Sequence, residues 1–243
     1  MLSRILEIAL LLALILGQAQ AAGTVLTVDM KGTITPASDD IVLAALERAE
    51  AEDARALMLL LDTPGGGLAE TTEILRLIDE SDIPVIGYVH PEGAAAWSAG
   101  TIILIGSDIA AMAPHTIIGS AQPVQFSPTG STVPVNDSKT TNAIVAMIEE
   151  KARKHGRNTT AAREFVLSNL NLNADEAMKY RVVEHIAPTP EELLAQINGT
   201  SIKDATLITK DAKLEAFEPP LNLQFLKMLS DPTIAGLLML IGL

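Results

Sequence analysis

The sequence ALMLLLDTPGGG, residues 56–67, joins an uninterrupted apolar run to three consecutive glycines. Apolar residues in a row without polar alternation are typical of a strand buried on both faces, as in a parallel sheet. The glycines allow a tight turn into the next segment, where apolar residues at helical spacing predict a helix over 68–78. A buried strand that passes through a turn into a helix indicates an α/β fold.

Strand and helix patterns alternate outward from this stretch, which extends the α/β prediction to most of the chain. Residues 119–137 are rich in Ser, Pro, Thr and Gly and predict an irregular excursion, and residues 198–220 resemble a linker with one candidate strand over 205–208. The other predicted strands are 25–28, 84–89, 109–112 and 181–186, and the other predicted helices are 36–53, 94–105, 139–154, 160–169, 174–180 and 191–197.

The composition limits the classes of function. The 243 residues suffice for one sizeable domain with short appendages, and 17 Lys and Arg against 30 Asp and Glu give a net charge of −13. This balance argues against nucleic acid as a partner, because phosphate binding requires a basic surface. The chain has no cysteine, and its four histidines lack metal-ligand spacing, so we expect no disulfide, no metal and no cofactor.

Both ends of the chain carry apolar segments. Residues 1–22 combine Arg4, an apolar run and the small-x-small site Ala19-Gln20-Ala21, which predicts a signal peptide or an N-terminal anchor and an exported domain. Residues 234–243 are apolar and uncharged, which predicts the start of a transmembrane helix in a truncated chain; the alternative is a terminal helix docked on the domain. The predicted division is 1–22 signal or anchor, 23–198 main α/β domain, 199–220 linker and 221–243 start of the membrane region.

The glycine turn is the first candidate functional loop. Consecutive glycines at a helix N-terminus can point backbone N–H groups at developing negative charge, as in an oxyanion hole. A phosphate-binding loop is a competing interpretation, but neither a GKS or GKT continuation nor GxGxxG is present. A plain tight turn is an equally good interpretation of this loop alone.

The second candidate loop is GAAAWSAG, residues 93–100, which follows the predicted strand 84–89. In an α/β sheet, loops at the carboxyl ends of neighbouring strands form the binding site. Small residues surround the hydroxyl of Ser98 and leave room for a substrate, so Ser98 is a candidate nucleophile. The alternative is a serine that caps an alanine-rich helix.

A serine nucleophile requires a base. His90 and His115 are poorly placed candidates, whereas a lysine can serve where burial lowers its pKa from about 10.4 toward neutrality. Lys139 opens the predicted helix after the polar excursion and is the lysine candidate. A surface lysine at a helix start is the competing interpretation.

Together these residues resemble the NfeD-type, stomatin-operon serine proteases, which are membrane relatives of the Clp protease and signal peptide peptidase A. The resemblance rests on the Ser98 loop and on DTPGG at 62–66, MAP at 112–114, IGSA at 118–121 and DPTIA at 231–235. It implies a Clp/crotonase-like fold of stacked ββα units and a Ser-Lys dyad of Ser98 and Lys139. It also implies an oxyanion hole formed by Gly66 and Ala99, with Gly65 and Gly67 adjacent.

The resemblance further implies a membrane-associated endopeptidase that cleaves hydrophobic segments of stomatin-like proteins and forms a homodimer or larger assembly. Apolar walls from Ile102, Ile103 and Ile118 would suit such a substrate. Two alternatives stay open. A crotonase-like acyl-CoA enzyme would use a carboxylate such as Asp62 or Glu92, and a non-catalytic scaffold would only organise a membrane complex.

Overall fold

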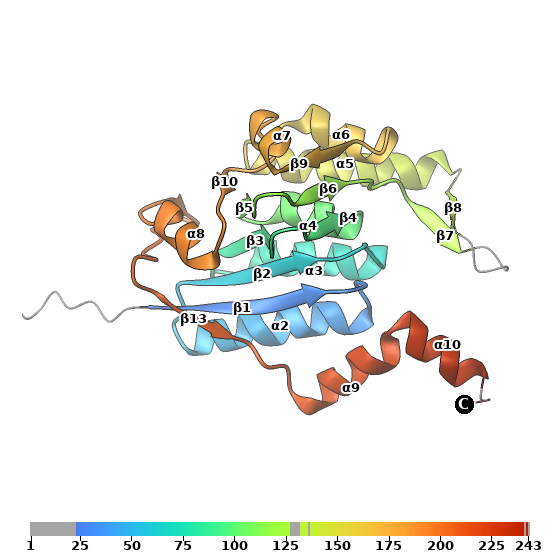
Figure 1. The fold of residues 1–243 in the computed structure, drawn as a ribbon, viewed down its shortest axis with the longest axis horizontal. Coiled ribbons are helices and arrows are strands. Elements are labelled where there is room, and N and C mark those ends of the chain that lie inside the picture. Colours follow the sequence, from blue (N-terminus) through green and yellow to red (C-terminus); the bar gives the residue numbers. More distant parts are fainter. Residues whose placement is uncertain (1–22, 127–131, 136, 241, 243) are drawn as a thin grey trace, which may run out of the picture.

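The computed structural model of the chain describes residues 23–126, 132–135, 137–240 and 242. Its centre is a six-stranded sheet in the order β10-β5-β3-β2-β1-β13, and all neighbouring strands are parallel (Figure 1). The α/β class predicted from the sequence is confirmed. The six strands are β1 Thr24–Lys31, β2 Ala56–Asp62, β3 Val85–Val89, β5 Ile109–Met112, β10 His185–Ile186 and β13 Lys213–Ala216.

The apolar run of β2 divides its side chains between two cores. Leu57, Leu59 and Leu61 belong to one buried cluster, and Ala56 and Met58 belong to a second one. Successive side chains of a strand point to opposite faces of a sheet. A continuous apolar run is therefore what a strand needs when both of its faces are covered.

Helices supply the cover for both faces (Figure 1). Side chains of α8 complete the smaller cluster, and those of α2 to α7 complete the larger one. All eight residues of α4 are buried, so this helix lies inside the protein. The bounds are α2 Pro36–Ala51, α3 Leu68–Glu80, α4 Ala99–Gly106, α5 Ser138–Lys154, α6 Thr159–Leu167, α7 Ala174–Lys179 and α8 Pro190–Ile197.

A second, three-stranded sheet consists of β4 Ala95–Trp97, β6 Ile117–Gly119 and β9 Asn171–Asn173. The helix predicted over 94–105 is wrong in its first part, because residues 95–97 form β4 and the helix begins only at Ala99. The Thr63 N–H donates to the Ala95 carbonyl at 2.8 Å, and the Trp97 N–H donates to the Thr63 carbonyl at 2.9 Å. Alanine favours a helix by less than about 1 kcal/mol per residue, so this pairing overrides the local preference.

The strand predicted over 181–186 is also shorter than expected. Only His185–Ile186 pair as β10, because the chain before them closes the end of α7. The Arg181 N–H donates to the Met178 carbonyl at 2.9 Å, and the Val182 N–H donates to the Ala177 carbonyl at 2.8 Å. These bonds to the last turn of α7 replace pairing with the sheet.

The segments expected to be irregular contain short strands. The excursion over 119–137 includes an antiparallel pair, β7 Val124–Phe126 and β8 Thr132–Pro134. The segment 199–220 contains a hairpin of β11 Ser201–Ile202 and β12 Ala205–Thr206, which shortens the predicted strand 205–208. It also contains the edge strand β13, which pairs with the start of β1 and was not predicted.

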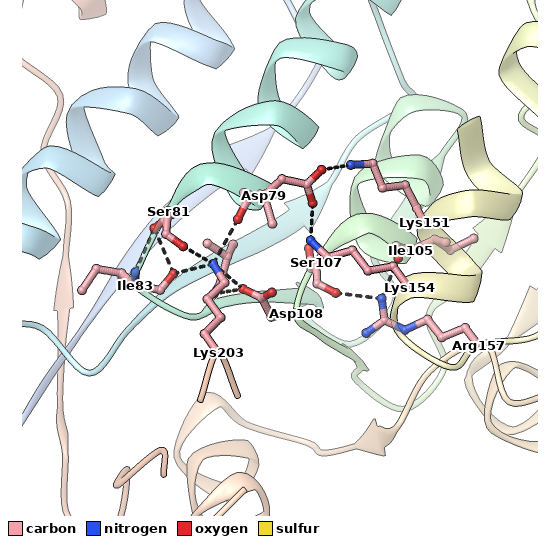
Figure 2. A network of polar contacts seen from close by, with 12 residues as sticks. Asp79, Ser81, Ile83, Ile105, Ser107, Asp108, Lys151, Lys154, Arg157 and Lys203 are labelled. Atoms are coloured by element: carbon pink, nitrogen blue, oxygen red, sulfur yellow. Dashed lines mark hydrogen bonds and ion pairs between the residues drawn. The ribbon is translucent and has the colours of Figure 1, made fainter. Parts of the chain in front are cut away.

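The turn of the β11–β12 hairpin is fastened to the domain by one lysine (Figure 2). The Lys203 ammonium donates to the carbonyls of Ile78 at 3.0 Å, Ser81 at 2.6 Å and Ile83 at 3.2 Å, and lies 3.0 Å from the Asp108 carboxylate. Two of these carbonyls belong to the C-terminal end of α3, where a cation is favourable to the helix dipole. The β11–β12 hairpin, which follows residue 198, is thus fastened to the folded domain.

Two helices end the described chain, α9 Leu221–Ser230 and α10 Pro232–Leu240. Leu223 and Leu226 of α9 pack on the larger core, next to α2. Within the described ranges no helix is both long and apolar enough to cross a membrane. The predicted signal peptide or anchor, residues 1–22, lies outside the described residues.

Candidate active site

Ser98 lies at the junction of β4 and α4 in a constrained backbone conformation. Its φ of 51° and ψ of −110° fall in a region that L-residues rarely adopt, and such strain typically amounts to about 1–3 kcal/mol. Its N–H donates to the Gly119 carbonyl at 2.9 Å. Strained serines at strand-to-helix turns are typical of nucleophiles, because the turn presents the hydroxyl outward.

The side chain of Ser98 does not serve the helix that it begins. Ser98 is the N-cap residue of α4, but its side chain makes no capping hydrogen bond. Serine is favoured at this position because its oxygen normally accepts from the first turn. The structure therefore disfavours the helix-cap interpretation and leaves the hydroxyl of this partly buried residue without a capping role.

The glycine loop lies directly against Ser98. Gly65 has a φ of 107°, and a Cβ built on it would lie 2.7 Å from the Ser98 Cβ and 3.2 Å from the Ser98 Oγ. The hydroxyl of the buried Thr63 accepts from the Gly65 N–H at 3.0 Å and shapes the turn. The structure therefore brings together the two loops that the sequence analysis selected.

Gly66 is held from the other side by the chain after β1. The Ile34 N–H donates to the Gly65 carbonyl at 2.9 Å, and the Gly67 N–H donates to the Ile34 carbonyl at 3.0 Å. A Cβ on Gly66 would lie 2.1 Å from the Ile34 carbonyl oxygen, so only glycine fits here. Sequence reasoning missed Ile34, because its contribution is made by backbone atoms.

Two backbone N–H groups near Ser98 have no acceptor among the described residues. Ala99 is the first residue of α4, where an N–H has no intrahelical partner. The Gly66 N–H likewise donates to no oxygen of the described chain. A backbone N–H group without an acceptor is available to a negative charge that develops nearby.

Lys139 lies in the first turn of α5, and its side chain is exposed. Its backbone N–H donates to the Asp137 carboxylate at 3.1 Å, and this carboxylate caps the helix. Among the described contacts, none joins the Lys139 ammonium to Ser98. The burial that the sequence analysis expected of a lysine base is absent from this conformation.

The candidate histidines and the candidate carboxylates do not form a catalytic triad with Ser98 among the described contacts. His90 packs on Tyr88 with ring centroids 5.0 Å apart, and burial lowers the pKa of its imidazole. His115 and Glu92 face each other at 3.8 Å on the exposed surface. Asp62 lies 3.8 Å from the Lys31 ammonium. The described residues contain no group of three His, Asp or Glu side chains that could hold a metal ion.

The expected apolar walls of the site are wrong. Ile102, Ile103 and Ile118 are at most 4% exposed and belong to the core. Ile102 and Ile103 belong to α4, which is buried on every side, and Ile118 belongs to β6, so none of the three can reach a substrate.

Most of the chain matches a known protein family. The model of the family described as NfeD1b, N-terminal domain, matches residues 24–210. The chain belongs to the NfeD1b N-terminal domain family. The resemblance noted in the sequence is thereby confirmed, and the family match includes Ser98, Lys139 and both loops.

Two relatives extend well beyond the chain. The membrane-bound protease PH1510 of Pyrococcus horikoshii is 36% identical over 247 residues, which cover 99% of this chain and 56% of that protein. The membrane protein NfeD1b of Bacillus subtilis is 29% identical over 163 residues, which cover 61% of this chain and 36% of that protein. The chain thus spans about half the length of the first relative and about a third of the second.

Solved structures of a related protease share the fold. A lysine-to-alanine mutant of the 1510-N membrane-bound stomatin-specific protease, in complex with a substrate peptide, superposes with a TM-score of 0.80 at 36% identity. The match covers 87% of this chain and 99% of that one. A serine-to-alanine mutant of the protease gives a TM-score of 0.77 at 38% identity and covers 82% of this chain and all of its own.

Proposed function

We propose that this family member is a serine endopeptidase with Ser98 as nucleophile and Lys139 as general base. The observation that carries the proposal is the strained, uncapped Ser98, which packs against Gly65 of the glycine loop. The N–H groups of the adjoining residues Gly66 and Ala99, which have no acceptor among the described residues, support it. Support comes from the related protease, of which a serine mutant and a lysine mutant have been solved, the latter with a substrate peptide. This similarity favours a protease over an acyl-CoA enzyme or a scaffold.

The proposed reaction is acyl transfer. The Ser98 Oγ forms a bond to the peptide carbonyl carbon while neutral Lys139 takes the hydroxyl proton. The oxyanion accepts from the Gly66 and Ala99 N–H groups, and Gly65 and Gly67 keep the loop in place. The carbon–nitrogen bond then breaks, the lysine proton passes to the leaving amine, and water hydrolyses the acyl-enzyme by the same route. The mechanism requires Lys139 to leave its exposed position and approach Ser98.

The substrate class and assembly are part of the proposal. We infer a hydrophobic segment of a stomatin-like membrane protein as substrate, by similarity to the stomatin-specific protease. We also infer a Clp/crotonase-like superfamily fold, a homodimer or higher homo-oligomer, and an exported catalytic domain over residues 23–198 that follows a signal peptide or anchor. The edge strand β13, within the proposed linker 199–220, completes the sheet of this domain.

Labelling with a fluorophosphonate probe tests the dyad. We expect rapid modification of the intact chain, none of Ser98→Ala, and at least about 100-fold slower modification of Lys139→Ala, because an unassisted hydroxyl is a weak nucleophile. Ser168→Ala and Lys179→Ala, which change exposed residues of the same types, serve as matched controls. Equal labelling of the wild type and Lys139→Ala would refute the dyad.

Membrane attachment through residues 221–243 is proposed from the exposed face of α9. Leu221, Phe225 and Met228 are 82%, 56% and 48% exposed, although the other face of this helix already packs on the domain. We expect the chain to float with phosphatidylcholine vesicles and Phe225→Ser to reduce the floating fraction. Leu167→Ser, at an apolar residue of α6 that is 47% exposed, is the control. Equal flotation of both variants and the wild type would contradict attachment through α9.

A further inference from the structure

A buried hydroxyl beneath the nucleophile has no part in the chemistry proposed above. Thr101 is the third residue of α4 and is fully buried. Its Oγ lies 2.7 Å from the Ala96 carbonyl oxygen, 3.0 Å from the Gly119 carbonyl oxygen and 2.8 Å from the Gly119 nitrogen. Thr101 is therefore a polar side chain placed in an otherwise apolar helix.

These contacts use the only proton of the hydroxyl and one of its two acceptor sites. Its single proton is donated to one of the two carbonyls, and one of its lone pairs accepts from the Gly119 N–H. Ala96 belongs to β4 and Gly119 to β6, so one atom of α4 connects two neighbouring strands of the three-stranded sheet. Removal of the hydroxyl leaves the buried Gly119 N–H without this partner.

Both strand contacts lead directly to Ser98. Ala96 lies on β4, two residues before the nucleophile, and the Gly119 carbonyl accepts the Ser98 N–H at 2.9 Å. A strained backbone persists only where surrounding contacts determine it from several directions. The Thr101 hydroxyl, the Gly119 carbonyl and Gly65 are such contacts for the Ser98 turn.

We propose that Thr101 is a positioning residue that sets the backbone conformation of Ser98 and thereby the direction of its Oγ. Thr101 does not touch a substrate and acts only through Ala96 and Gly119. The inference rests on the proposed nucleophilic role of Ser98. It concerns the rate of attack by the hydroxyl rather than the affinity for a peptide.

The test compares Thr101→Val with Thr101→Ser in the full chain, below the unfolding temperature of the less stable variant. Valine keeps the shape of threonine without its hydroxyl, and serine keeps the hydroxyl without the methyl group. We expect Thr101→Val to slow fluorophosphonate labelling by about 10- to 100-fold, because small displacements of reacting atoms have effects of this size. Thr101→Ser should stay within about threefold of the wild type, since the contacts to Ala96 and Gly119 remain.

Thr209→Val is the matched control for the loss of a buried hydroxyl. Thr209 is 1% exposed, and its hydroxyl donates to the Leu194 carbonyl at 2.6 Å, in the second core. The Thr209→Val variant should be less stable than the wild type, but the labelling rate of Ser98 should be unchanged. With a peptide substrate, Thr101→Val should lower kcat and leave KM nearly unchanged.

Three results would overturn the inference: labelling of Thr101→Val at the wild-type rate, a loss in Thr101→Ser as large as in Thr101→Val, or an equal loss in Thr209→Val. If Thr101→Val does not fold, the labelling rate of Thr101→Ser still decides, because a rate far below that of the wild type would show that the methyl group matters and not the hydroxyl. Labelling that persists in Ser98→Ala would instead refute the proposed function.

Discussion

Ser98 and Gly65 constrain each other at the scale of single residues. The sequence analysis selected both as members of small-residue loops, but neither loop by itself distinguishes a catalytic site from a turn. The contact between them separates these interpretations, because the missing Cβ of Gly65 leaves the space that Ser98 occupies. Lys139 shows the opposite case, since its exposure at a helix start matches the competing interpretation of a surface lysine and not the burial expected of a lysine base.

Gly65→Ala should abolish most labelling of Ser98. The added Cβ would lie 2.7 Å from the Ser98 Cβ, so the serine must shift, and we expect a loss of about 100-fold in rate. Gly32→Ala is the control, because Gly32 also has a positive φ, of 87°, but a Cβ there meets nothing within 4 Å. The probe assay above measures both. Equal losses of labelling rate in the two variants would show that the strain of a positive φ is responsible, and not a steric clash with Ser98.

At the scale of elements, α4 is fixed at its C-terminal end by a buried arginine. The Arg157 guanidinium donates to the carbonyls of Ile105 at 2.6 Å and Ser107 at 2.7 Å, where Figure 2 shows it beside the end of the helix. It also forms a two-bond pair with the Glu184 carboxylate at 2.7 and 2.8 Å. The helix that carries Ser98 at its start is thus held at its end by a residue from a later segment.

Arg157→Ala should lower the free energy of unfolding by about 2–4 kcal/mol, because it leaves helix carbonyls and Glu184 without their partner. Urea denaturation measures this value. Arg163→Ala is the matched control: Arg163 is half exposed and pairs with Glu149 at the surface, where such pairs contribute less than about 1 kcal/mol. Similar losses of unfolding free energy in both variants would show that the buried Arg157 stabilises the protein no more than a surface arginine does.

At the scale of the whole molecule, stability should depend on the protonation of His155. Burial, reinforced by the charges of Arg157, Lys154 and Lys151 and opposed by Asp79, lowers the pKa of His155 from 6.5 to about 4. The unfolded chain therefore binds this proton more readily than the folded chain. The stabilising contribution of neutral His155 is complete above pH 6.5 and is lost as the pH falls toward 4.

The free energy of unfolding should fall by about 1–2 kcal/mol over this interval because of His155 alone, after allowance for its partial exposure. His155→Gln should flatten this part of the stability profile, as measured by urea denaturation at a series of pH values. His115→Gln, at a side chain that is 80% exposed, should leave the slope unchanged. An identical slope in the wild type and His155→Gln would contradict the prediction.

The sequence by itself determined the features that neighbouring residues encode. The apolar run of β2, the glycines after it and the spacing of α2, α3 and α5 were readable because burial on a face repeats with the period of a strand or a helix. Ser98 was selected for another reason, namely the small residues around it after a predicted strand, whereas the strand β4 that leads into it was predicted as part of a helix.

Only the tertiary structure decided which segments meet. Strand β4 forms against Thr63 despite its alanines, β13 joins the sheet despite its polar sequence, and Thr101 reaches Gly119 beneath the nucleophile. These contacts join residues far apart in the chain, largely through backbone atoms that every residue type carries. Local periodicity in the sequence therefore cannot predict these contacts, which form only when the sheet brings the segments together.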